Sequence, residues 1–121
     1  MYRVLYVDDD DDIREIAEMS LSLREDFDVV TCNSGARALE IAEDWSPHLI
    51  LLDVMMPDMD GPTTLAAMRT IPSLASTPVV FITARTQASD VERFIALGGK
   101  GVIAKPFDPM LVAEQAAAFL T

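Results

Sequence analysis

Cysteine and histidine are nearly absent from this sequence. Its 121 residues include one cysteine, Cys32, and one histidine, His48. A single cysteine cannot form a disulfide within the chain, which fits a reducing cytoplasm as the expected location. A single histidine disfavours a histidine-rich metal cluster and a phosphate carried on histidine by this chain itself. We expect His48 to lie in the loop before the third strand.

Positive charge and long apolar runs are also scarce. Nine Lys and Arg against 20 Asp and Glu give a formal net charge of −11. This balance disfavours direct binding to nucleic acid or to anionic membranes. It suits a site for a hard cation, or a basic patch on a protein partner. The apolar runs are too short for a membrane span, and the N-terminus lacks the charged-then-apolar pattern of a signal peptide.

Hydrophobic residues, in contrast, are plentiful and regularly spaced. They make up 50% of the chain, which is enough for one domain with a real core, expected to cover residues 1–121. Short apolar runs rich in branched residues alternate with amphipathic segments. These runs predict strands at residues 4–7, 28–32, 49–52, 79–83 and 101–104.

The segments between the predicted strands have the spacing of amphipathic helices. Ser34 is expected to cap the second helix, Gly61 and Pro62 to start the third, and Asp108 to cap the fifth before Pro109. Strands that alternate with helices predict an α/β fold of three αβα layers, with a parallel sheet covered on both faces. The residues expected to face the core from the helices are Ile13, Ile16, Ala17, Leu21, Ala38, Leu39, Ala42, Trp45, Val91, Phe94, Ile95, Leu111, Val112 and Phe119.

Polar side chains gather where the predicted strands end. Ligands of a parallel sheet bind at the carboxyl ends of strands, at the point where the strand order reverses. The common order 2-1-3-4-5, the flavodoxin-like arrangement, places the first and third strands side by side at that point. The first strand ends in Asp8 and Asp9, the third in Asp53, the fourth in Thr83 and the fifth in Lys105. We therefore expect three carboxylates, a hydroxyl and an ammonium group to converge in one crevice.

The stretch "LYVDDDDDIREI" contains five consecutive aspartates. Asp8 and Asp9 are expected to face the crevice, while residues 10–12 begin the first helix, where the helix dipole favours acids. The run does not fit a calcium-binding loop, because Ile13 stands where that loop requires glycine and Met19 stands where it requires a bidentate acid.

Carboxylates that converge in this way suit magnesium-assisted phosphoryl transfer. Two carboxylates about 4 Å apart repel by roughly 4 kcal/mol at an effective dielectric constant of 20, so three of them need a cation or a proton. Oxygen-only surroundings suit Mg²⁺, which also bridges to phosphate. A carboxylate that attacks phosphorus forms an acyl phosphate, and the metal, an ammonium group and a hydroxyl can neutralise the transferring group.

Four segments resemble the signature segments of the response-regulator receiver domain of two-component signalling, in order and at the usual spacing. They are "VLYVDDDDDIREI", "PHLILLDVMMPDMDG", "PVVFITA" and "GVIAKPF". The resemblance covers essentially the whole chain and extends to the single-domain regulators of chemotaxis. It implies that Asp53 is the phosphoacceptor, with Asp8, Asp9, Asp53 and the backbone carbonyl of Met55 holding Mg²⁺.

The resemblance also implies roles for the ends of the last two strands. Thr83 and Lys105 would contact the phosphoryl oxygens, and the peptide bond between Lys105 and Pro106 would be cis. The phosphoryl group would come from a phosphohistidine of a sensor kinase or phosphotransfer protein. A downstream protein would bind the surface of the fourth helix, fifth strand and fifth helix. Catalysis would be limited to self-catalysed phosphotransfer and autodephosphorylation, so the chain is not expected to be a turnover enzyme.

Some features depart from the family, and alternatives stay open. Val102 stands where relatives commonly have an aromatic switch residue, and the fifth helix lacks the Lys and Arg of the salt-bridged dimers. One alternative is a phosphatase of the haloacid dehalogenase type, although Asp12 replaces the threonine of its Asp-x-Asp-x-Thr motif and a cap insertion would have no room. Another is a pseudo-receiver that acts only in docking. The sequence leaves open whether the domain stands alone or belongs to a larger protein.

Overall fold

The predicted strands form a single parallel sheet in the computed structural model, which describes residues 1–120. Its strand order is β2-β1-β3-β4-β5, as predicted. The predicted strands are confirmed, and the first three are longer by one or two residues than expected. Their bounds are β1 Tyr2–Val7, β2 Phe27–Cys32, β3 Leu49–Asp53, β4 Val79–Thr83 and β5 Gly101–Ala104.

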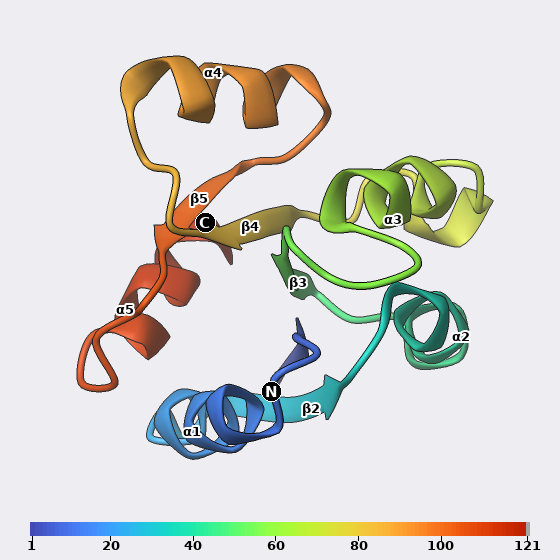
Figure 1. The fold of residues 1–121 in the computed structure, drawn as a ribbon. Coiled ribbons are helices and arrows are strands. Elements are labelled where there is room, and N and C mark those ends of the chain that lie inside the picture. Colours follow the sequence, from blue (N-terminus) through green and yellow to red (C-terminus); the bar gives the residue numbers. More distant parts are fainter. Residues whose placement is uncertain (121) are drawn as a thin grey trace.

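Helices cover both faces of the sheet and complete three αβα layers. Figure 1 shows α1 and α5 on one face and α2, α3 and α4 on the other. Every residue of β3 and β4 is buried, because these strands lie inside the sheet and carry helices on both sides. The helices are α1 Asp11–Leu21, α2 Gly35–Trp45, α3 Gly61–Met68, α4 Ala88–Ala96 and α5 Val112–Ala117, with short 3₁₀ turns at Pro72–Leu74 (η1) and Ala118–Leu120 (η2).

Side-chain caps fix where the first three helices begin. Asp10 caps α1 by accepting two backbone N–H groups, and Ser34 caps α2 as predicted. Asp60 caps α3, which begins at Gly61 with Pro62 in its first turn. Such caps contribute about 1 kcal/mol each. Because each of these helices follows a strand that leads to the carboxyl edge of the sheet, the caps also fix the loops at that edge.

The start of the fifth helix differs from the sequence-based expectation. The Asp108 carboxylate accepts the backbone N–H of Met110 at 2.8 Å, and α5 begins only at Val112. The prediction that Asp108 caps α5 is therefore wrong. The physical reason is that an aspartate can bond the backbone two residues ahead, and this local turn competes with the helical start.

Three residues expected in the core lie at the surface instead. Ile16 is 46% exposed, and Ile95 and Leu111 are each 51% exposed. Leu111 precedes α5, which begins only at Val112, so it is not on the packed face of that helix. On α1 the face that packs on the sheet consists of Ala17, Ser20 and Leu21, so Ile16 lies beside it rather than in it. His48 lies in the loop before β3, as expected, and its Nδ1 accepts the backbone N–H of Arg3 at 2.9 Å. No helix within residues 1–120 is long and apolar enough to cross a membrane.

Candidate functional site

The carboxyl ends of β1 and β3 bring the predicted acids together. The two strands are paired in register, with Val7 opposite Leu52, so the residues that follow, Asp8 and Asp53, come side by side. Asp9 is the next residue along the chain from β1. Ligand oxygens of these three aspartates lie within 4.8 Å of one another. The convergence of three carboxylates predicted from the sequence is confirmed.

The three aspartates differ in their exposure to solvent. Asp8 is fully buried and Asp53 is 3% exposed, whereas Asp9 is exposed. Two ionised carboxylates held out of water next to each other are unfavourable unless a cation lies close. The cluster therefore favours a cation close to its carboxylates.

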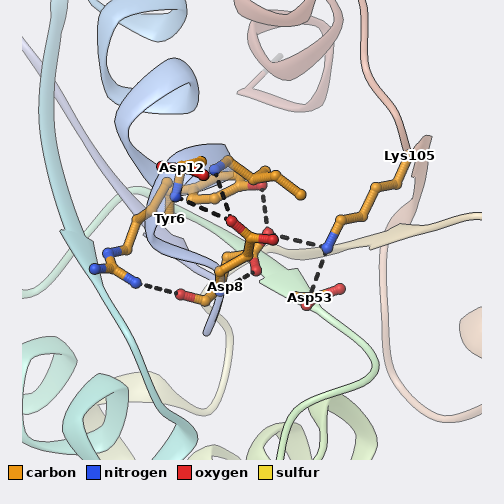
Figure 2. Close-up of polar contacts among 8 residues, drawn as sticks. Tyr6, Asp8, Asp12, Asp53 and Lys105 are labelled. Carbon is orange, nitrogen blue, oxygen red and sulfur yellow. Dashed lines mark hydrogen bonds and ion pairs between the residues drawn. The ribbon is translucent and has the colours of Figure 1, made fainter.

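Lys105 supplies one such charge from the end of β5. Its Nζ lies 3.1 Å from Oδ2 of Asp8 and 3.2 Å from Oδ2 of Asp53. Figure 2 draws these two contacts as dashed lines from Lys105. The peptide bond between Lys105 and Pro106 is cis, as predicted. Three carboxylates and one ammonium group leave two negative charges, which is the charge a divalent cation would neutralise.

Oδ2 of Asp53 is the one buried side-chain oxygen or nitrogen in the described part of the chain that has no hydrogen bond. Lys105 lies within ion-pair distance of this atom, but the two groups are not aligned as donor and acceptor. A buried carboxylate oxygen without a donor costs free energy unless a ligand occupies the space in front of it. Asp53 is therefore the buried acid of the cluster that keeps a carboxylate oxygen free to react or to bind a metal, because the carboxylate oxygens of Asp8 both accept hydrogen bonds.

The electrostatics of the site act on the ionisation of Asp53 and Lys105. Burial and the neighbouring Asp8 charge raise the pKa of Asp53 above its usual range, against the smaller opposite effect of Lys105. Partial burial works to lower the pKa of Lys105, but its contacts with Asp8 and Asp53 outweigh burial and leave that pKa above its ordinary value. Lys105 is thus charged at neutral pH. Ionisation of Asp53 is opposed by the negative charge of Asp8.

Tyr6, predicted from the sequence only as a member of an apolar strand, takes part in this network. Its hydroxyl donates a hydrogen bond to Oδ2 of Asp8 at 3.0 Å, the same oxygen that Lys105 contacts (Figure 2). Burial, followed by the charge of Asp8, raises the pKa of Tyr6 above its ordinary value, so the phenol is a donor. The sequence did contain a signal: residues two apart in a strand point to the same side, and Tyr6 stands two residues before Asp8.

Thr83 is near the site without touching its carboxylates in the described structure. It ends β4, is 6% exposed, and its Oγ1 accepts the backbone N–H of Arg85 at 3.0 Å. Met55 lies two residues after Asp53 in the following loop, and its side chain is 82% exposed. The prediction that the backbone carbonyl of Met55 binds a metal remains a prediction.

The donor set fits a small, hard divalent cation. The side chains available are carboxylates, which Mg²⁺ prefers over nitrogen or sulfur ligands. The remaining negative charge of the cluster and the unsatisfied oxygen of Asp53 both favour a bound cation. The cluster could therefore hold a divalent metal ion.

The sequence of this chain is similar to those of known signalling proteins. The sequence profile of the response regulator receiver domain matches residues 4–117. The transcriptional regulatory protein CpxR of Escherichia coli is 38% identical over 115 residues, which cover 94% of this chain and 47% of that protein. An uncharacterized transcriptional regulatory protein, YrkP of Bacillus subtilis, is 37% identical over 106 residues, which cover 88% of this chain and 44% of that protein. The chain thus spans about half the length of the curated relatives it matches.

The fold itself is shared with solved structures. The chemotaxis response regulator CheY4 of Vibrio cholerae superposes with a TM-score of 0.91 at 30% sequence identity, covering 99% of both chains. The chain belongs to the response-regulator receiver domain family of two-component signalling. This family is a class of signalling domain rather than of turnover enzymes.

Proposed function

We propose that Asp53 is the phosphoacceptor of this receiver domain. The observation that carries the proposal is the buried Oδ2 of Asp53, which has no hydrogen-bond donor yet faces two other carboxylates and an ammonium group. A carboxylate oxygen held in this way can attack phosphorus. The domain is proposed to act as one unit over residues 1–121.

The proposed donor is a phosphohistidine on a sensor kinase or on a histidine phosphotransfer protein. An oxygen of Asp53 forms the new O–P bond as the P–N bond of the phosphohistidine breaks, and the departing imidazole takes up the bond's electron pair and a proton. Asp53 becomes an acyl phosphate. The same site would later admit water to hydrolyse it, so the chemistry of the chain is limited to accepting and losing one phosphoryl group.

Asp8, Asp9, Asp53 and the backbone carbonyl of Met55 are proposed to hold Mg²⁺. The ion, when bound, would neutralise negative charge on the transferring phosphoryl group. Lys105 is proposed to bind a phosphoryl oxygen once Asp53 carries the phosphoryl group. Its ammonium group already forms ion pairs with Asp8 and Asp53, so only a small movement is needed. The hydroxyl of Thr83 is proposed to donate to another phosphoryl oxygen. The negative charge of the phosphoryl group on Asp53 would then be neutralised by the ammonium group of Lys105 and would accept a hydrogen bond from Thr83.

The output is proposed to be a protein partner that binds the surface of α4, β5 and α5. Helix α4 and strand β5 lie next to the site because β4 and β5 are neighbours in the sheet (Figure 1). Turnover of small phosphate esters is not part of the proposal, since Asp12 holds the position of the phosphatase threonine. Direct contact of this domain with nucleic acid or a membrane is not part of the proposal.

Mapping of the acyl phosphate tests the proposal. The protein is incubated with a small phosphodonor and Mg²⁺, the acyl phosphate is trapped by borohydride reduction, and peptides are analysed by mass spectrometry. We expect the label on Asp53 and its loss in Asp53→Asn. Asp58→Asn is a matched control, because Asp58 is an aspartate of the loop after β3 that is not part of the cluster. A label on any other residue, or persistence of labelling in Asp53→Asn, contradicts the assignment.

A further inference from the structure

Two arginines differ from the other cations of this acidic chain. Seven of the nine Lys and Arg side chains donate to a carboxylate or to a backbone carbonyl: Arg3, Arg14, Arg24, Arg37, Arg69, Lys100 and Lys105. Within residues 1–120, the side chains of Arg85 and Arg93 have neither kind of acceptor. The chain has 20 acidic residues, yet none of those described forms an ion pair with these two arginines.

Both arginines line the same groove. The groove runs between the loop after β3, the start of α3 and helix α4, and has a volume of about 660 Å³. Figure 1 shows α3 and α4 on the same face of the sheet, on either side of β4. Arg85 lies in the loop after β4, and Arg93 lies on α4 with its guanidinium 5.0 Å from the centre of the Phe94 ring. Two like charges that share a groove repel each other, and an anion placed between them would remove the repulsion.

The rest of the groove is mainly apolar and open to solvent. Val54, Met55, Pro62 and Leu97 supply apolar surface, and the side chains of Met55 and Leu97 are 82% and 49% exposed. Exposed large apolar side chains next to unpaired arginines are typical of protein-binding surfaces.

One acid of the chain also lines the groove, and it does not neutralise the arginines. Asp60 uses its carboxylate to cap α3, with Oδ1 accepting the backbone N–H of Thr63 at 2.8 Å. It forms no ion pair with either arginine among the described residues. The positive charge of the groove is therefore available to a ligand.

We propose that this groove binds a short acidic segment of a protein partner, with its carboxylates on Arg85 and Arg93 and an apolar side chain against Met55 and Leu97. Charge complementarity selects this occupant. The chain as a whole carries a net charge of −11 and repels acidic partners. An acidic segment is therefore expected to bind where arginines are not already neutralised by acids of the same chain. The surface is distinct from the one formed by α4, β5 and α5, because it lies on the α3 side of α4.

Selection from a random peptide library displayed on phage tests the proposal. The full chain is the target, and the Arg85→Glu/Arg93→Glu double variant serves for counter-selection. We expect enrichment of peptides that combine Asp or Glu with Leu, Ile or Phe. A synthetic, fluorescently labelled peptide of the selected sequence should bind the wild type, and its Kd should rise about tenfold in Arg85→Ala/Arg93→Ala and also rise with salt.

Arg37→Ala is the matched control, since Arg37 is an exposed arginine on α2 that is already paired with Glu40. It should leave the peptide's Kd unchanged. Neither groove substitution removes the backbone N–H of Arg85 that Thr83 accepts, so the circular dichroism spectrum should stay as in the wild type. A failure of phosphorylation in the wild type would count against the proposed function and not against the groove.

Three outcomes would overturn the proposal. The first is selection of peptides without acidic enrichment, or equal binding by wild type and double variant. The second is competition by millimolar inorganic phosphate with no peptide selected, which would make the arginines a simple anion site. The third is self-association of the wild type in analytical ultracentrifugation that the Arg85→Glu/Arg93→Glu variant loses, which would make a second copy of the chain the occupant.

Discussion

At the scale of single residues, the best-connected group of the site is the carboxylate of Asp8. Its Oδ1 accepts the backbone N–H of Asp10, and its Oδ2 accepts from Tyr6 and Lys105. If Lys105 moves onto a phosphoryl group, it leaves Oδ2 of Asp8, and the Tyr6 hydroxyl is then the remaining side-chain donor to that oxygen. Tyr6 therefore keeps the carboxylate oriented in both states of the site.

Replacement of that tyrosine gives a direct test. Tyr6→Phe keeps the ring, which packs edge-on against Phe107 with centroids 6.3 Å apart, and removes only the hydroxyl. We expect the Mg²⁺ affinity measured by calorimetry to fall about tenfold, since groups that orient a metal ligand commonly contribute that much. The control is Tyr2→Phe, in the chain's other tyrosine, which lies on the same strand and is 41% exposed. An unchanged Mg²⁺ affinity in Tyr6→Phe would contradict an orienting role.

At the scale of elements, the loop between β4 and α4 is the part most directly linked to the site. In the unphosphorylated structure the Thr83 hydroxyl accepts the backbone N–H of Arg85, which ties the start of this loop to the end of β4. A phosphoryl group on Asp53 would offer this hydroxyl an acceptor, and its movement would change the loop. Val102, on the neighbouring strand β5, is stiff at its first torsion and has no hydroxyl, so it cannot follow with the rotation of an aromatic switch.

We therefore expect the phosphorylation signal to depend on Thr83. In wild type, phosphorylation of Asp53 should shift the NMR signals of residues 84–92. Thr83→Ala should abolish these shifts while Asp53 still accepts phosphate, because a ligand moves a two-state element only by contacts that differ between the states. Thr83→Ser keeps the hydroxyl and should retain the shifts. Persistence of the shifts in Thr83→Ala would show that another group carries the signal.

At the scale of the whole molecule, the repulsion within the acidic cluster lowers the stability of the metal-free fold. Mg²⁺ bound at the proposed site should raise the melting temperature by mass action, since a ligand that binds only the folded state stabilises it. Asp9→Asn should raise the melting temperature of the metal-free protein and reduce the effect of Mg²⁺, because it removes one repelling charge and one ligand. Differential scanning fluorimetry with and without Mg²⁺ measures both. Equal Mg²⁺ effects in wild type and Asp9→Asn would argue against this metal site.

The pH dependence of stability provides a further check on Asp53. Its pKa in the metal-free fold is raised to about 6 from the ordinary value of 3.8. A carboxyl whose pKa is raised in the folded state binds its proton more tightly there than in the unfolded chain. Its ionised form therefore lowers the free energy of unfolding above the folded-state pKa. This loss of stability disappears as the pH falls to the pKa of the unfolded chain. Each unit of pKa corresponds to about 1.4 kcal/mol.

Asp53→Asn should therefore stabilise the metal-free protein at pH 7.5 by on the order of 3 kcal/mol and by much less near pH 4. Urea unfolding without Mg²⁺ at the two pH values gives the comparison. A gain that does not depend on pH would mean that the substitution acts through packing rather than through the charge.

Sequence patterns alone were enough to predict the strands and the identity of the clustered residues, while the order 2-1-3-4-5 was expected as the common order of such a sheet. Alternating apolar runs predict a parallel sheet, and residues at successive strand ends must then share one edge. Asp8, Asp9, Asp53 and Lys105 could be placed together for that reason. Helix starts at Ser34 and at residues 10–12 were also predictable, because capping depends on neighbours a few residues away along the chain.

Tertiary structure alone decided the features that depend on side-chain direction and on contacts between distant segments. The sequence does not show that Asp8 and not Asp9 is fully buried, or that Oδ2 of Asp53 lacks a donor. It also does not show that Arg85 and Arg93 are the two cations without a polar acceptor in the described chain. The reason is physical: a hydrogen bond or ion pair depends on distances of about 3 Å between atoms, and strand or helix periodicity fixes only the side on which a residue lies.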